Sequence, residues 1–165
     1  MPIAAQGLTT SQFLATKPNL FTSDFQFPVM VLRDSSLEHN IKRMAAYCKG
    51  HGFELAPHAK TPMSPQIAKR QIDAGAWGLT VANFNQARIM VEYGFKKLII
   101  GNEVMEPTSI AEIAKINGSG AGYIIFYIDS LAGLKIAQSS IDGVANAKLN
   151  IFMEIGAVGG RAGIR

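Results

Sequence analysis

Short apolar runs alternate with amphipathic, helix-like segments along most of this chain. Five such runs are predicted to be strands, and they span residues 53–59, 78–82, 97–100, 123–128 and 149–155. Polar turns follow them, and apolar residues at helical spacing follow the first four. Strands and helices in regular alternation are typical of a parallel sheet with crossover helices. Because the runs are apolar rather than alternating, we expect strands that are buried on both faces.

The beginning of the chain departs from this pattern. Residues 1–26 are polar and mixed, without clear periodicity, and are predicted to form an irregular arm. A further strand is predicted at residues 27–32. A helix is predicted after it, because apolar residues from Leu37 to Cys48 share one helical face and Gly50 ends the pattern.

Two architectures fit the alternation of strands and helices. An open, doubly wound sheet would be complete with the five strands that begin at residue 53. An eight-stranded barrel typically needs about 250 residues, so this chain would hold only its first part. The chain stops in a glycine-rich turn directly after a strand, with no helix to cover that strand. We therefore expect residues 27–165 to be the first part of an eight-stranded barrel.

The composition limits the partners that we expect. The net charge is +4, but charged residues make up only 17% of the chain and are scattered. No basic stripe interleaved with aromatic residues is present, so nucleic acid is not an expected partner. No apolar run approaches the roughly 18 residues of a membrane span, and no signal peptide is recognised, so no membrane partner is expected. The single Cys48 excludes an intrachain disulfide and favours a reducing, cytoplasmic location.

The sequence Pro57-His58-Ala59-Lys60-Thr61 is the strongest candidate for chemistry. It lies where a predicted strand gives way to the loop before a helix, at the edge where α/β folds collect catalytic groups. Lys60 is either a solvated surface charge or an amine whose pKa is lowered by desolvation, which would make it a nucleophile. His58 would share a strand face with Lys60. It is either a rim histidine with satisfied hydrogen bonds or a group that orients a cofactor.

The glycine-rich tail carries a second candidate. Its glycines do not have the spacing of a dinucleotide-binding fingerprint. Arg161 is a cation at the exit of the last strand, suited to an oxyanion or a phosphate. Glu154, inside the apolar run, either pairs with Arg161 or with Lys60, or faces solvent at the strand end. Asp129, at another strand exit, is predicted to cap a helix. No histidine or cysteine spacing indicates a metal site.

Several segments resemble the fold-type III pyridoxal-phosphate enzymes. Within them the likeness is to the D-threonine aldolase and D-serine dehydratase (amino-acid deaminase) group, relatives of the alanine racemase N-terminal domain. The matching segments are residues 27–40, 57–61, 64–68, 74–82, 101–104 and 153–163. The resemblance covers about residues 27–165, and its most specific part is the Pro-His-x-Lys-Thr segment with the helix start that follows.

The resemblance implies a (β/α)8 TIM-type barrel with pyridoxal 5'-phosphate bound in its mouth. Lys60 matches the family lysine that forms a Schiff base with the cofactor and acts as a base at the substrate α-carbon. Arg161 matches the arginine near the phenolic oxygen of the cofactor ring. His58 and Asn102 are expected to line the same mouth.

The same family places other parts of its site beyond the position that matches Arg165. These parts are the phosphate-binding loops, the ligands of a divalent metal and a dimer-forming β-domain. The chain alone is therefore expected to be poorly active or unstable, and the full-length protein is expected to be a homodimer. Two departures concern the subclass: Ala56 stands where the family usually has arginine, and Pro62-Met63 replaces its His-Lys pair.

The leading hypothesis is a pyridoxal-phosphate-dependent lyase or dehydratase that acts on a β-hydroxy D-amino acid such as D-serine or D-threonine. Three alternatives remain open from the sequence. They are an amino-acid racemase of the same fold, a non-catalytic pyridoxal-phosphate carrier, and an unrelated five-stranded binding domain with an ordinary surface lysine.

Overall fold

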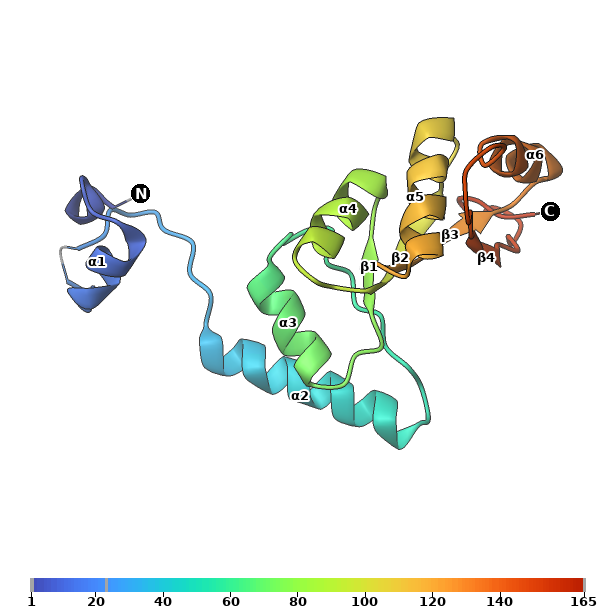
Figure 1. The fold of residues 1–165 in the computed structure, drawn as a ribbon. Helices are drawn as coiled ribbons and strands as arrows, with labels where there is room; N and C mark the ends of the chain where they lie inside the picture. The colour runs from blue at the N-terminus through green and yellow to red at the C-terminus, as the bar shows by residue number, and fades with distance from the viewer. Residues whose placement is uncertain (1, 23, 165) are drawn as a thin grey trace. The chain divides into compact units, whose positions relative to one another are not determined.

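The chain divides into two compact units, Met1–Glu38 and His39–Arg165, in a computed structural model that describes residues 2–22 and 24–164 (Figure 1). The first unit holds a 3-10 helix, η1 (Ile3–Ala5), and an α-helix, α1 (Thr10–Ala15). Helix α2 (Asp34–Gly50) begins in the first unit and continues into the second. The remaining helices and the sheet belong to the second unit.

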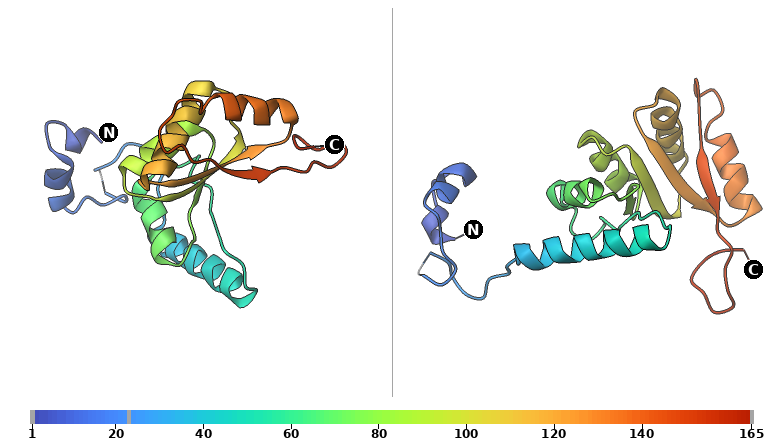
Figure 2. Two further views of the ribbon diagram at one scale, coloured as in Figure 1. Left: turned by 45° about the vertical axis from the view of Figure 1, so that its right-hand side comes forward. Right: turned by 90° about the horizontal axis from the view of Figure 1, so that it is seen from below.

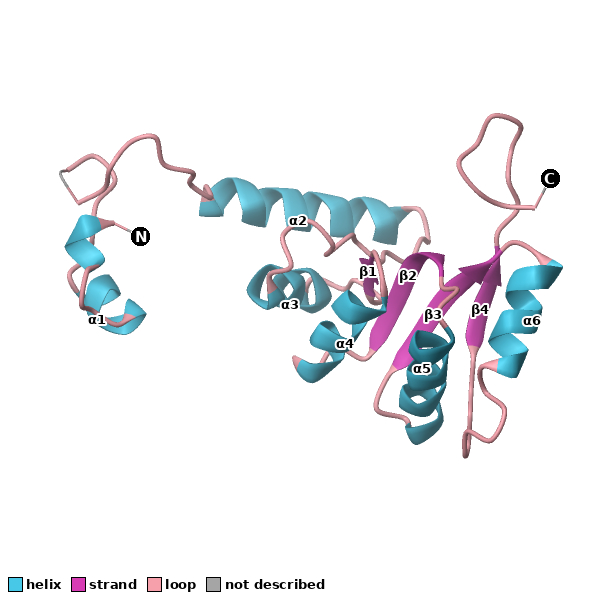
Figure 3. Ribbon diagram, turned by 90° about the horizontal axis from the view of Figure 1, so that it is seen from above, coloured by secondary structure: helices cyan, strands magenta, loops and turns pink. Residues whose placement is uncertain are grey.

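Four parallel strands form one sheet in the order of the sequence. They are β1 (Leu79–Val81), β2 (Lys97–Glu103), β3 (Tyr123–Ile128) and β4 (Asn150–Met153). Helices α3 (Pro65–Asp73), α4 (Phe84–Glu92), α5 (Pro107–Ser119) and α6 (Leu131–Ser139) lie along one side of the sheet (Figure 3). A doubly wound sheet reverses its strand order and carries helices on both faces. The sequential order and the single helical layer are instead those of a barrel segment.

The core lies between the sheet and this helical layer. Alternate strand residues are fully buried there, namely Leu79, Val81, Leu98, Ile100, Ile124 and Phe126. They share one apolar cluster with Ala87 and Met90 of α4 and with Ile110 and Ile113 of α5. Because side chains alternate along a strand, the intervening residues belong to the opposite face of the sheet. We call that face the open face, and it carries Thr80, Gly101, Glu103, Tyr127 and Phe152.

Polar side chains cap the helices that follow the strands. Ser64 accepts a hydrogen bond at the start of α3, Asn83 does so at the start of α4, and Ser130 does so at the start of α6. The prediction that Asp129 is a helix cap is therefore wrong. Helix α6 begins at Leu131, which puts the neighbouring serine at the N-cap position.

The predicted irregular arm, residues 1–26, contains the two short helices η1 and α1, which corrects that prediction. Thr9 and Gln12 form a reciprocal capping box at the start of α1. The Thr9 N–H donates to Gln12 Oε1 at 2.8 Å, and the Gln12 N–H donates to Thr9 Oγ1 at 3.2 Å. These bonds give partners to backbone N–H groups that would otherwise be unpaired at the helix start. The six residues of α1 can therefore be helical although they have no apolar stripe. The first unit extends to Glu38, beyond the predicted end of the arm.

Two predicted strands are not formed as expected. Residues 27–32 form no strand, and Met30 and Leu32 are 97% and 65% exposed. A strand needs a neighbour for its backbone hydrogen bonds, and none is seen for this segment among the described residues. Residues 53–59 run beside β1 but make a single parallel bridge, from His58 to Thr80. Pro57 has no N–H to donate, which interrupts the ladder at that point.

None of the helices in residues 2–22 and 24–164 combines the length and the apolar character that crossing a membrane requires.

Candidate active site

The predicted site residues follow strands or lie near their carboxyl ends. All four strands are parallel, so their carboxyl ends meet at one edge of the sheet, which is where barrel enzymes carry their active sites. The residues come from the segment beside β1, from the end of β2 and from the loop after β4. Each is positioned by different local contacts.

Lys60 lies in a turn that the backbone holds at both ends. The N–H of Ala59 donates to the carbonyl of Thr80 at 2.8 Å, and the N–H of Met63 donates to the carbonyl of Ala59 at 3.0 Å. Ala59 itself is only 2% exposed, whereas Lys60 is exposed. The carbonyl of Lys60 accepts a hydrogen bond from Nε2 of Gln86 at 3.3 Å. The lysine therefore has a fixed main chain and an accessible amine.

His58 precedes this turn and lies against the open face. A Cβ placed on Gly101 would approach Cε1 of His58 to 3.5 Å and Cγ2 of Thr80 to 3.1 Å. The histidine ring and the threonine methyl are therefore packed around a glycine, and a larger residue there would displace them. The hydroxyl of Thr80 donates to the carbonyl of Ala56 at 2.7 Å. These contacts fix the segment that leads to Lys60 onto strands β1 and β2.

Asn102 lies next to Gly101, near the end of β2. Its side chain is exposed. The pairing of β2 with β3 changes register between Ile99 and Glu103, so this part of the strand is irregular. Among the described residues, the hydrogen bonds that position Lys60 do not involve Asn102, and its predicted role in cofactor binding stays a prediction.

Glu103 and Glu154 form a carboxyl pair on the open face. Strand register places Glu103 opposite Tyr127 and Tyr127 opposite Phe152, and Glu154 is two residues beyond Phe152. Burial, together with the hydrogen bond to Glu103 and the negative charge of that residue, raises the pKa of Glu154, whereas the charge of Arg161 lowers it. One oxygen of each carboxyl, Glu103 Oε1 and Glu154 Oε2, is buried without a hydrogen-bond partner. The principal partner of Glu154 is thus a second carboxyl group.

Arg161 lies on the loop after β4, which extends beyond the end of the strand (Figure 2). The loop is closed at its base, because the N–H of Ile164 donates to the carbonyl of Glu154 at 2.9 Å. Asp129 holds it as well, since its Oδ2 accepts from the N–H of Gly163 at 3.4 Å. Arg161 is exposed on this loop and acts electrostatically on Glu154. Among the described residues no ion pair or hydrogen bond joins Arg161 to Glu154, so their predicted pairing stays a prediction.

The predicted residues therefore form two groups. His58 lies in the segment that pairs with β1, and Lys60 lies in the turn directly after it. The His58 ring also lies close to Gly101 of β2. Glu154 and Glu103 lie together at the β4 end of the open face, where the charge of Arg161 reaches Glu154. Among the described residues, no hydrogen bond or ion pair links the two groups.

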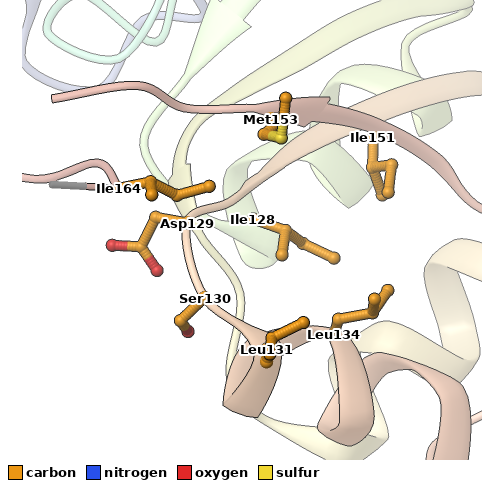
Figure 4. A pocket seen from close by; sticks show the side chains of 8 residues that line it. All are labelled: Ile128, Asp129, Ser130, Leu131, Leu134, Ile151, Met153 and Ile164. Carbon is orange, nitrogen blue, oxygen red and sulfur yellow. The ribbon is translucent and has the colours of Figure 1, made fainter.

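A separate apolar pocket of about 250 Å³ lies on the other side of the β3–β4 pair (Figure 4). Its lining includes Leu131 and Leu134 of α6 and Ile151 and Met153 of β4. It contains none of the predicted site residues. No group of three histidine, cysteine, aspartate or glutamate side chains suited to a metal ion occurs within residues 2–22 and 24–164.

Curated relatives of the chain are named as lyases of β-hydroxy amino acids. The 3-hydroxy-D-aspartate aldolase of Paracoccus denitrificans is 30% identical over 150 residues, which are 89% of this chain and 38% of the relative. The D-threonine aldolase of Arthrobacter sp is 29% identical over 138 residues, which are 83% of this chain and 35% of the relative. The chain thus spans little more than a third of the length of these relatives. No family model matches it.

Solved structures agree with these sequences. D-threonine aldolase from Filomicrobium marinum has a TM-score of 0.78 at 27% identity, covering 86% of this chain and 38% of that one. The predicted resemblance is confirmed. D-threo-3-hydroxyaspartate dehydratase from Delftia sp. HT23 gives 0.70 at 25% identity, over 86% of this chain and 36% of that one. An alanine racemase-like protein from Idiomarina loihiensis has a TM-score of 0.64 at 20% identity, covering 74% of this chain and 32% of that one. This match shows a likeness of fold alone.

The sequence analysis did not place Thr80 or Gln86 in the site, and it did not predict the pairing of Glu103 with Glu154. Gln86 carried a detectable signal, because it lies three residues after the helix cap Asn83. The carboxyl pair carried none, because 51 positions of sequence separate its members and only strand register brings them together.

Proposed function

We propose that this chain forms the first part of the barrel of a pyridoxal-phosphate-dependent lyase that acts on β-hydroxy D-amino acids. The observation that carries the proposal is the placement of Lys60. Its main chain is held by Gln86 and by the bonds around Ala59, and its amine is exposed at the carboxyl edge of a parallel sheet. This is the arrangement that a lysine needs in order to bind a carbonyl group covalently.

The residues present fit such a cofactor chemically. Lys60 is exposed and so accessible to an aldehyde, and His58, two residues before it in the chain, is packed against Gly101 and Thr80. Arg161 offers a permanent cation for an oxyanion, and it stands on a loop that is closed at its base. Bound pyridoxal phosphate would supply an electron sink for the charge that develops at the substrate α-carbon.

The residues of this chain would then divide the work. Lys60 would hold the cofactor and, when released as a free amine, would move a proton at the α-carbon of the substrate. His58 would orient the bound group, and Asn102 would line the same mouth. Arg161 would face the phenolic oxygen and, through its charge, keep the nearby carboxyl pair from repelling that oxygen.

The proposed substrates are small β-hydroxy D-amino acids. The names of the relatives, which refer to 3-hydroxy-D-aspartate, D-threonine and D-threo-3-hydroxyaspartate, support this class. Elimination of water and aldol cleavage both start at the carbon that Lys60 would serve, so either reaction is compatible with the proposal. The racemase alternative has only a likeness of fold in its favour.

We also propose that the full-length protein is a cytoplasmic homodimer, in which residues beyond those seen here grip the phosphate and bind a divalent metal. The likeness to aldolases and dehydratases more than twice as long supports the existence of such further parts. The buried free thiol of Cys48 supports a reducing compartment.

The proposal is tested by adding pyridoxal phosphate to the full-length protein and recording its absorbance near the edge of the visible range. We expect a new band that is absent in Lys60→Ala and retained in the control Lys135→Ala, which removes another exposed lysine. Turnover of D-serine, D-threonine and 3-hydroxy-D-aspartate, compared with D- and L-alanine, then separates lyase from racemase. A folded protein without the band would overturn the proposal.

A further inference from the structure

Gln86 makes three hydrogen bonds that together join two turns of the site edge. Its main-chain N–H donates to Oδ1 of Asn83 at 3.0 Å. Its side-chain Oε1 accepts from the N–H of Ala82 at 2.9 Å. Its side-chain Nε2 donates to the carbonyl of Lys60 at 3.3 Å, across 26 positions of sequence. The first two bonds serve the start of α4, whereas the third reaches the lysine turn.

Both the oxygen and the nitrogen of the Gln86 side-chain amide are hydrogen-bonded, and the two bonds have different roles. The oxygen accepts from the N–H of Ala82, the residue before the N-cap Asn83, and so ties the end of β1 to the first turn of α4. An ordinary capping box reaches the N–H of the N-cap itself. The nitrogen adds a connection that a helix cap does not need. A carboxylate could replace the oxygen but not the nitrogen, because it has no hydrogen to donate.

Gln12 in α1 shows what the cap alone looks like. It occupies the same third position, and its Oε1 accepts from the N–H of Thr9 at 2.8 Å. Its side chain is exposed, and its recorded bonds stay within the capping box. The comparison separates the local role of such a glutamine from the long-range bond that Gln86 makes.

The turn that Gln86 reaches needs such a connection. Met63 has a positive φ of 38°, which is unusual for a residue with a side chain. The bond from the Met63 N–H to the carbonyl of Ala59 closes the turn around Lys60. Beside it, residues 53–59 pair with β1 through one bridge only. Without the Gln86 bond, the carbonyl of Lys60 would have no fixed partner within the described contacts of the turn.

We infer that Gln86 is a positioning residue for Lys60, which fixes the main chain of the lysine turn and so the direction of the amine. The inference rests on the proposed function, since it assigns Lys60 as the residue that holds the cofactor. Gln86 itself does not touch the reacting atoms. Its effect is expected on how well the lysine binds the cofactor rather than on the stability of the fold.

The variant Gln86→Glu separates the two roles, because it keeps the oxygen that accepts from Ala82 and removes the donor to Lys60. In the full-length protein, we expect its affinity for pyridoxal phosphate to fall about fivefold, the factor that corresponds to the loss of one ordinary hydrogen bond. Without cofactor, amide hydrogen exchange in residues 60–63 should become faster. The melting temperature and exchange in α4 should stay those of the parent. Gln12→Glu should change none of these quantities.

The outcomes distinguish this inference from the proposed function. A parent protein with the cofactor band, together with a Gln86→Glu variant of unchanged affinity and unchanged exchange in residues 60–63, would overturn the inference alone. Faster exchange throughout α4, with a lower melting temperature, would also overturn it by showing that the residue acts as a cap. A folded parent without any cofactor band would overturn the proposed function and this inference with it.

Discussion

The two faces of the sheet are built from neighbouring residues but differ in chemistry, because the open face mixes polar groups with apolar residues such as Ile125. On the helix-covered face, Leu98, Ile100 and Phe126 are completely buried among apolar side chains. On the open face, adjacent positions carry Thr80, Glu103 and polar groups with buried, unpaired oxygens. Apolar burial stabilises a fold, whereas a buried polar group without a partner costs stability. The helix-covered face therefore accounts for the fold, and the open face carries groups that the fold alone does not need.

The largest expected difference between the faces is in stability. Phe126 and Tyr127 are adjacent on β3, and Phe126 is fully buried whereas Tyr127 is half-buried. We expect Phe126→Ala to lower the free energy of unfolding by about 3–5 kcal/mol, because it leaves a cavity in the core. Tyr127→Ala should lower it by roughly 1–2 kcal/mol, the transfer term for a partly buried ring. Chemical denaturation measures both. Equal losses of unfolding free energy in the two variants would contradict the distinction between the two faces of the sheet.

A smaller effect is expected where the open face is most tightly packed. In Gly101→Ala, the added methyl would meet Thr80 Cγ2 at 3.1 Å and His58 Cε1 at 3.5 Å. The Thr80 methyl must then give way by a few tenths of an ångström, whereas the His58 ring stays at an ordinary contact distance. Because the Thr80 hydroxyl holds the carbonyl of Ala56 in the segment that leads to Lys60, affinity for pyridoxal phosphate should fall several-fold while stability falls by roughly 1 kcal/mol. Gly50→Ala is the control, because a Cβ there meets nothing within 4 Å. Unchanged affinity in Gly101→Ala would show that the position of Thr80 does not matter for the cofactor site.

The smallest effect concerns the carboxyl pair and depends on pH. Because burial and Glu103 raise the pKa of Glu154, the folded protein retains a proton that the unfolded chain releases. The stability that this protonated group contributes is present below its ordinary pKa of 4.5 and is lost as the pH rises through the folded value. Glu154→Gln should therefore be more stable than the parent at neutral pH, with the difference shrinking below pH 4.5.

Thermal unfolding of both proteins across this pH range measures the difference. Glu92→Gln serves as the control, since the Glu92 carboxyl forms only an exposed ion pair with Arg88 at 3.8 Å. A parent that gains stability relative to Glu154→Gln as the pH rises would contradict the raised pKa of Glu154.

Much of the fold could be predicted because it is encoded locally. The run at 123–128 became β3 with the same bounds, and a helix follows each of the first four apolar runs, as the helical spacing of apolar residues indicated. The two strand predictions that failed were wrong about pairing rather than about propensity. Residues 27–32 have the composition of a strand, but a strand depends on a neighbour that composition does not reveal.

The candidate site was predictable only in part, for the same physical reason. The local sequence predicts the turn that carries the lysine and histidine of the Pro-His-x-Lys-Thr segment, although the run before it pairs with β1 through one bridge only. The contact of Gln86 with Lys60 crosses 26 positions, and the meeting of Glu103 with Glu154 depends on register in three adjacent strands. Such contacts depend on the order and register of the strands, which cannot be predicted from the local sequence.

The central claim is that Lys60 holds pyridoxal phosphate covalently, and chemical trapping tests it most directly. The full-length protein would be incubated with pyridoxal phosphate, reduced with borohydride and digested, and the labelled peptide would be identified by mass spectrometry. We predict one cofactor mass increment, located on Lys60 and absent in Lys60→Ala. Label spread over surface lysines such as Lys69 and Lys135, or a folded protein with no label, would contradict the claim.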